Sequence, residues 1–300
     1  MENQNQTPIT KKDYSLPISI IIAAVFIAGA WIYSANFNYR LAPLDSNKAA
    51  ANLSEVITPQ KGFILPVNWG NLGKQLTDLG VIDQNKFGQI LNSRNELTVE
   101  TQKLLSESGN NKIIITSQNA GTLLNFFWAL GLANKNKILE QGPMSQYGDA
   151  SRFASTGGWT LVMGSPMDHY SMHSLINLTP EQQKLVEETS QNIYRPCCNN
   201  PTHFPDCNHG MAMLGLLELM ASQGAGHEEM YRAALAVNSY WFPDQYLTIA
   251  KFLNTKGIDW NKSSPEKILA KEFSSASGYQ WVSEQVVQPE EREQKGGCAV

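Results

Sequence analysis

The pattern of apolar and polar residues separates an apolar N-terminal stretch from a longer, mixed region. No charged residue occurs between Asp13 and Arg40, and residues 16–33 are almost wholly apolar. A helix of about 18 residues reaches about 27 Å, close to the hydrocarbon thickness of a bilayer. The pattern therefore predicts a transmembrane anchor over residues 16–34. Lys11 and Lys12 precede it, which favours a cytoplasmic segment over residues 1–15 and an extracytoplasmic location for the rest.

The same stretch has an alternative interpretation as a cleaved signal peptide. Ala28, Gly29 and Ala30 have the small-x-small form that signal peptidases accept. The apolar run continues past them through residues 31–33, which favours an anchor that is retained. Residues 35–62 are polar and read as a tether, with a short helix around Ala49–Val56. In either interpretation the folded part of the chain is exported.

Helical periodicity dominates the remaining sequence, and we expect an all-α or strongly α-dominated globular domain over residues 63–288. Helices are predicted for six segments: Ala120–Leu139, Thr179–Tyr194, Gly210–Gln223, Glu228–Tyr240, Gln245–Asn254 and one that begins at Ser264. Thr179, Pro180 and Gln182 form the clearest start signal, with an N-cap, a proline at the first helical position and a capping-box residue. One strand is predicted, Lys112–Thr116, and the polar residues 289–300 form a flexible tail.

Composition limits the classes of function. The chain is 42% hydrophobic and 17% charged, which suits one globular domain rather than a disordered or multispanning protein. Its 23 basic and 27 acidic residues are spread along the chain and form no basic cluster, so we expect no nucleic-acid partner. No phosphate-binding glycine motif and no Gly-x-Ser-x-Gly elbow occurs, and Ser274–Gly278 reads as a serine-rich loop.

Candidate chemistry is concentrated between Tyr194 and Gly210. This segment holds three of the four cysteines and two of the five histidines. Three prolines stiffen it, so its side chains can be held in place with little further loss of entropy: Pro196, Pro201 and Pro205. Cys207 and His209 stand just before an apolar helix, whose positive dipole end favours a thiolate over a thiol.

Three interpretations compete for this segment. A transition-metal site would combine soft thiolates with borderline imidazoles, and its candidate ligands are Cys197, Cys198, Cys207, His209 and His203. A disulfide from Cys207 to Cys197 or Cys198 would instead stiffen a binding module in an oxidising compartment. A catalytic thiol, activated by His203 or His209 and oriented by Asp206, would make the protein an oxidoreductase or hydrolase.

A second irregular segment, residues 141–173, is rich in glycine and ends in two histidines. His169 and His173 are four residues apart, so on a helical turn they would face the same way and could share an ion. Five of the nine methionines flank these or the cysteine motifs, which favours Cu(I): Met163, Met167, Met172, Met211 and Met213. Those near 211 also have the spacing of core residues. We expect the two segments to lie close together.

These observations lead to one hypothesis with alternatives. The sequence predicts a membrane-anchored, extracytoplasmic, helical domain that binds copper or zinc. Its primary ligands would be Cys197, Cys198, Cys207 and His209, and His169, His173 and His203 would be secondary ligands. Whether the metal would catalyse, be transferred or only stiffen the loop stays open. The disulfide-stabilised module and the thiol enzyme stay open as well.

Overall fold

A computed structural model describes residues 46–94, 98–107, 109 and 112–286. The predicted cytoplasmic segment, anchor and tail lie outside these residues. The chain divides into two compact units after Asn52, and of the first unit only the beginning of helix α2 (Ser46–Ile57) is described. This is the short helix expected within the tether. Among the helices of the described residues, none is long and apolar enough to cross a membrane.

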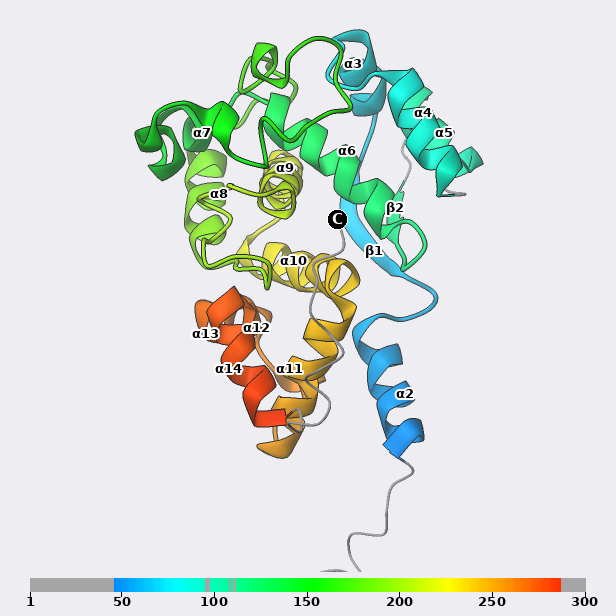
Figure 1. Ribbon diagram of the computed structural model, residues 1–300, viewed down its shortest axis with the longest axis vertical. Helices are drawn as coiled ribbons and strands as arrows, with labels where there is room; N and C mark the ends of the chain where they lie inside the picture. The colour runs from blue at the N-terminus through cyan, green and yellow to red at the C-terminus, as the bar shows by residue number, and fades with distance from the viewer. Residues whose placement is uncertain (1–45, 95–97, 108, 110–111, 287–300) are drawn as a thin grey trace, which may run out of the picture. The chain divides into compact units, whose positions relative to one another are not determined.

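The second unit is dominated by helices, as predicted (Figure 1). Those that precede the cysteine-rich segment are α3 (Leu72–Asp78), α4 (Gln84–Ser93), α5 (Val99–Ser106), α6 (Ala120–Ala133), α7 (Lys137–Gln141) and α8 (Pro180–Gln191). Those that follow it are α9 (Asn208–Ser222), α10 (His227–Trp241), α11 (Pro243–Thr255), α12 (Pro265–Leu269), α13 (Lys271–Ser274) and α14 (Ala276–Val286). Single 3-10 turns occur at η1 (Pro143–Tyr147), η2 (Ala150–Arg152), η3 (Pro166–Asp168) and η4 (Trp260–Lys262).

Helices α6 and α9 pack backbone to backbone at the centre of this unit (Figure 1). A Cβ on Gly131 would lie 2.1 Å from the carbonyl oxygen of Met211, and one on Gly215 would lie 2.5 Å from that of Phe127. Every residue of α9 from Gly210 to Ala221 is buried. The start of α9, which carries the candidate ligands, is therefore joined to a buried and closely packed pair of helices.

The break between α6 and α7 is stabilised by a buried carboxylate. The two oxygens of Glu218 accept hydrogen bonds from the amides of Asn134 (2.8 Å) and Asn136 (2.6 Å). Burial raises the pKa of Glu218 well above its ordinary value, although both amides oppose the shift. The predicted helix Ala120–Leu139 consequently ends at Ala133, because the amides of the next residues are turned inward.

A two-stranded antiparallel sheet joins β1 (Phe63–Asn68) to β2 (Lys112–Ile115), with Ile64 opposite Ile114. Only β2 was predicted. Pro66 interrupts the sequence pattern of β1 and argues against a strand there, but the two-stranded sheet leaves both strands with a free edge that tolerates proline. The expected serine-rich loop is also corrected, because Ser274–Gly278 comprises the end of α13, a one-residue break and the start of α14.

Candidate metal centre

The cysteine-rich segment forms a closed loop between α8 and α9. Its entrance is fixed where Tyr194 donates its N–H to the carbonyl oxygen of Leu269 (2.9 Å). Ile193 accepts hydrogen bonds from both the backbone N–H and the hydroxyl of Thr202 (2.8 and 3.0 Å). Prolines supply much of the remaining stiffness, since each restricts its own φ and its neighbour's conformations. The loop is thus held by the fold and does not depend on its cysteines for closure.

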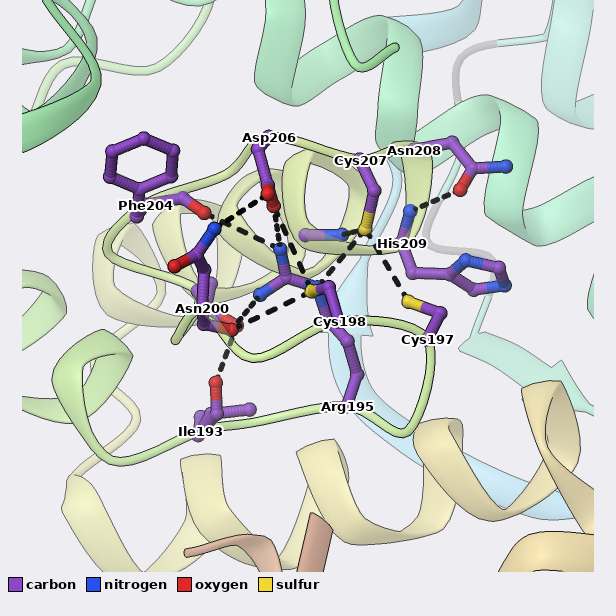
Figure 2. A network of polar contacts seen from close by, with 12 residues as sticks. Ile193, Arg195, Cys197, Cys198, Asn200, Phe204, Asp206, Cys207, Asn208 and His209 are labelled. Carbon is purple, nitrogen blue, oxygen red and sulfur yellow. Dashed lines mark hydrogen bonds and ion pairs between the residues drawn. The ribbon is translucent and has the colours of Figure 1, made fainter. Parts of the chain in front are cut away.

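Arg195 occupies the centre of this loop and is almost completely buried, with 1% of its surface exposed. Figure 2 shows its guanidinium surrounded by acceptors from the loop. It donates to Sγ of Cys207 (3.1 Å), to the carbonyl oxygen of Asn200 (2.9 Å) and to Oδ1 of Asp206 (2.7 Å). A buried cation needs such compensation, and the loop supplies it from several directions at once.

The acceptors around Arg195 are themselves oriented. The side-chain amide of Asn200 donates to Oδ2 of Asp206 (2.7 Å), so both carboxylate oxygens have partners. Gly210 leaves room for the guanidinium, because a Cβ there would lie 2.4 Å from its Nη2 atom. The backbone N–H of Gly210 also donates to Sγ of Cys207 (3.4 Å), which makes the cysteine the N-cap of α9.

Cys207 lies closest to the other candidate metal-binding side chains of the loop, and both groups described below contain it. Its Sγ lies 3.5 Å from Sγ of Cys197, and the three cysteines of the loop are free. A disulfide requires about 2.05 Å between the sulfurs. Two thiolates bound to one tetrahedral zinc ion at about 2.3 Å lie about 3.8 Å apart. The observed separation is closer to that of two sulfurs sharing a metal ion.

Two groups of residues place metal-binding atoms within 4.8 Å of one another, and both contain Cys207. The first is completed by Cys197 and His209, and the second by Cys198 and Asp206. Either group can hold a metal ion. Ligands of a tetrahedral zinc ion lie roughly 3.4–3.8 Å apart, so binding would draw the donors slightly inward.

The two groups differ in the charged and aromatic side chains that already contact their metal-binding atoms. Arg195 contacts Cys207, which both groups share, but only the second group contains Asp206, whose carboxylate is already paired with Arg195 and Asn200. In the first group, the His209 ring packs against Phe242, with ring centroids 4.4 Å apart, and Cys197 is exposed. An ion could reach this group from solvent without displacing Arg195. The first group is therefore the better metal site.

The electrostatics of the loop favour a thiolate at Cys207. Hydrogen bonds with Cys197 and Cys198 lower the pKa of Cys207 well below its ordinary value, and the Arg195 charge lowers it further against the effect of burial. Hydrogen bonds with Cys198 and Cys207 raise the pKa of Cys197, and burial raises it further. The contact with Cys197 lowers the pKa of Cys198. The contact with Cys207 and burial raise it by more, so that the pKa is about 11. Of the three cysteines, Cys207 is thus the one whose surroundings favour the thiolate, which is the form that binds metal ions.

Comparisons with protein-family models, curated proteins and solved structures give no match to this chain. The interpretation of the site therefore depends on its geometry.

The three secondary histidines belong to neither group of ligands. His203 packs toward α8, with Nδ1 3.3 Å from the hydroxyl oxygen of Ser190. His169 and His173 contact each other, with Nδ1 of the first 2.9 Å from Nε2 of the second. They do so on irregular backbone after η3 rather than on one helical turn. The methionines near His209 are core residues, since Met211 and Met213 are buried.

The two irregular segments do meet, although not through their histidines. The backbone N–H of Ser155 donates to the carbonyl oxygen of Asp206 (3.2 Å). The ring of Phe204 packs edge-on against those of Tyr147 and Phe153, with centroids 5.3 and 5.7 Å apart. The glycine-rich segment thus buttresses the cysteine loop and contributes no ligand to it.

The outer edge of the loop is attached to the last described helix. Cys198 accepts a hydrogen bond from the N–H of Ala276 (2.9 Å), and the Asn199 side chain accepts one from that of Ser277 (2.9 Å). Sequence reasoning did not find these contacts or the role of Arg195. An arginine flanked by proline and cysteine in an uncharged stretch was the available signal, because such a charge must be either exposed or paired within the loop.

Proposed function

We propose that the protein is a membrane-anchored, extracytoplasmic domain that binds copper or zinc through Cys197, Cys207 and His209. The observation that carries the proposal is the convergence of these three donors within 4.8 Å, on a stiff loop and the first turn of a buried helix. Thiolates and imidazole suit Cu(I) and Zn(II), and carboxylate-preferring ions are disfavoured. Three protein ligands also leave a coordination position for an exchangeable ligand, as in catalytic or transfer sites.

Metal content of matched variants tests this proposal. The full chain, purified with detergent and reductant, should bind about one equivalent of Zn(II) or Cu(I) at this site. Cys207→Ser and His209→Ala should each weaken binding by at least about 100-fold, since each removes a ligand. Cys198→Ser is the matched control and should retain the affinity. Equal losses for Cys198→Ser and Cys207→Ser, with none for His209→Ala, would favour the second group instead.

Thiol chemistry at Cys207 is the second candidate function. It is supported by the lowered pKa of Cys207 and by a second thiol 3.5 Å away. A protein that binds neither ion when reduced, but cycles between dithiol and disulfide, would support this candidate and overturn the metal proposal.

The membrane location is supported by the uncharged stretch of residues 16–33 and by Lys11 and Lys12 before it. Exposed Cys197 provides a test. In intact cells that produce the Cys298→Ser form and are treated with a chelator, a membrane-impermeant maleimide should label Cys197 without permeabilisation, and adding Cys197→Ser should remove that label. Labelling that requires lysis would contradict the extracytoplasmic location.

A further inference from the structure

His169 and His173 form a second pair of metal-binding side chains, separate from the cysteine loop. Their backbones are held by different anchors. His173 donates its N–H to the carbonyl oxygen of Ala133 (2.9 Å) and accepts from the N–H of Lys135 (2.8 Å), which makes a parallel bridge beside the end of α6. His169 follows η3 and donates its N–H to the carbonyl oxygen of Pro166 (3.1 Å). The two rings meet because both ends of the turn are fixed.

The turn between the two histidines has an unusual backbone. Ser171 has a φ of +55°, the only positive φ of a non-glycine residue in the described part of the chain. Such a conformation is disfavoured and persists only where the surroundings impose it. Here the Ser171 N–H donates to the carbonyl oxygen of Leu132 (2.8 Å), and its hydroxyl accepts from the N–H of Asn136 (3.1 Å). This left-handed residue directs both imidazoles to the same side of the turn.

The hydrogen bonds of the rings define which nitrogen faces which. Nε2 of His169 lies 3.4 Å from the carbonyl oxygen of Met163, which can only accept, so this contact favours the tautomer with the proton on Nε2. Nδ1 of His169 then presents its lone pair to Nε2 of His173, 2.9 Å away. Histidines that bind metals commonly donate their other ring N–H to a backbone carbonyl, which fixes the tautomer. His169 has this arrangement, and its ring is buried.

We propose that His169 and His173 bind a copper(I) ion between Nδ1 of the first and Nε2 of the second. The ion replaces the proton that the two nitrogens share, and that proton moves to Nδ1 of His173, so no proton is lost and no electron is transferred. Two nitrogens at about 2.0 Å from one ion lie roughly 3.3–4 Å apart, depending on the bond angle. The rings therefore need to separate by roughly 0.4–1.1 Å from their present 2.9 Å.

The composition of the surroundings selects copper(I) over divalent ions. Within the described residues, no third histidine, cysteine or carboxylate joins the pair at metal-binding distance. Zinc and other divalent ions take four or more ligands, whereas copper(I) is stable with two or three and accepts thioethers. Met163 and Met172 flank the pair in sequence and are 59% and 63% exposed. The thioethers of exposed methionines are suited to supplying such a soft third ligand.

Anaerobic titration with copper(I), supplied as its acetonitrile complex, tests the pair in the full-length protein. Wild type should bind one equivalent of copper(I) more than His169→Ala or His173→Ala. The reason is that each substitution should weaken the affinity of the pair for copper(I) at least tenfold. His227→Ala is the matched control. Nδ1 of His227 also contacts a side chain, the hydroxyl of Thr189 at 2.8 Å, but that partner is not an imidazole. His227→Ala should leave copper binding unchanged.

Long-range ¹⁵N–¹H spectra of the wild-type imidazoles give a readout that does not depend on how the variants fold. Copper(I) should shift Nδ1 of His169 and Nε2 of His173 and convert His173 to the Nδ1–H tautomer. Cys207→Ser should keep these shifts while it loses the ion bound by the cysteine loop. The experiment therefore tests the histidine pair independently of the cysteine site. Unshifted ring nitrogens, or histidine variants that bind as much copper(I) as wild type, would overturn the proposal.

Discussion

The cysteine loop and the glycine-rich segment are both long, irregular and rich in candidate ligands, yet they organise their chemistry differently. The loop turns its polar groups inward around Arg195, which contacts Asn200, Asp206 and Cys207 together. Residues 141–173 instead form separate short turns with local hydrogen bonds, such as that from the N–H of Ser151 to Oδ1 of Asp149 (2.9 Å). A central buried charge therefore brings several polar groups of the loop together at one point. Local turns bring together only residues that are close in sequence, such as His169 and His173.

This comparison also explains why the two segments tolerate different residues. The loop is crowded at Gly210, where a side chain would collide with Arg195. In the glycine-rich segment, Gly148 has open space around it, but its φ of +85° favours glycine for conformational reasons. The first glycine serves a long-range contact and the second a local turn.

Removal of the central cation should give the largest effect. Arg195→Met should lower the free energy of unfolding of the reduced, metal-free protein by about 3–5 kcal/mol, because Asp206 and Cys207 lose their buried partner. Arg152→Met, at an exposed position of the glycine-rich segment, is the matched control and should change it by less than about 0.5 kcal/mol. Urea unfolding measures both. Similar losses for the two variants would refute the view that a buried charge organises only the cysteine loop.

Oxidation should have the next largest effect. In metal-free protein carrying Cys298→Ser, a mild oxidant should join Cys197 to Cys207, whose sulfurs are 3.5 Å apart, and leave Cys198 as the free thiol. Closing a loop of this size should stabilise the protein by about 2–3 kcal/mol. Peptide mapping with thiol counting identifies the bond, and thermal unfolding with and without reductant gives its effect. A bond that contains Cys198 would show that the second group of ligands is the more reactive.

A smaller loss is expected from crowding the loop. Gly210→Ala should destabilise the protein by about 1–3 kcal/mol, because the new methyl group displaces the guanidinium. Gly88→Ala, on helix α4 with open space around it, is the control and should stabilise by about 0.5–1 kcal/mol. Chemical denaturation of both variants measures the difference. A neutral Gly210→Ala would mean that Arg195 can move without loss.

The smallest effect concerns the pH dependence contributed by His203. Burial lowers the pKa of His203, and the charge of Glu187 opposes the shift. The folded protein therefore binds fewer protons than the unfolded chain, whose histidine titrates near pH 6.5. This contribution to stability is complete above about pH 6.5 and is lost as the pH falls toward the lowered value. Thermal unfolding between pH 7 and pH 5 should decline less steeply for His203→Gln, and an unchanged slope would contradict this assignment.

Local signals in the sequence were sufficient for much of the helical framework. Thr179 forms the predicted capping box with Gln182, and α8 begins at Pro180 as expected. The apolar run after His209 is helix α9, although it starts two residues before Gly210, at Asn208. Such signals act within one or two turns of backbone, so they can be read without knowledge of the fold. Strand β1 was missed because its stability comes from pairing with a distant segment.

The candidate site could be predicted only in its residue types. Cys197, Cys207 and His209 were among the predicted ligands, but their separation from His169 and His173 depends on how α8 and α6 are placed. Sequence spacing indicated that the two histidines would meet, yet the turn that joins them is left-handed rather than helical. The burial of Arg195 is a tertiary property, since its partners come from both ends of the loop.

The attachment of the loop to α14 has a consequence for biosynthesis. Asn199 and Ser277, which share a hydrogen bond, are 78 positions apart, so the outer edge of the loop cannot be completed until the chain has been made as far as Ser277. During translation, the thiols are present long before that contact can form. The order in which the chain emerges therefore gives oxidants and metal donors access to the cysteines ahead of their native neighbours, and the fate of the site can be decided before the domain is folded.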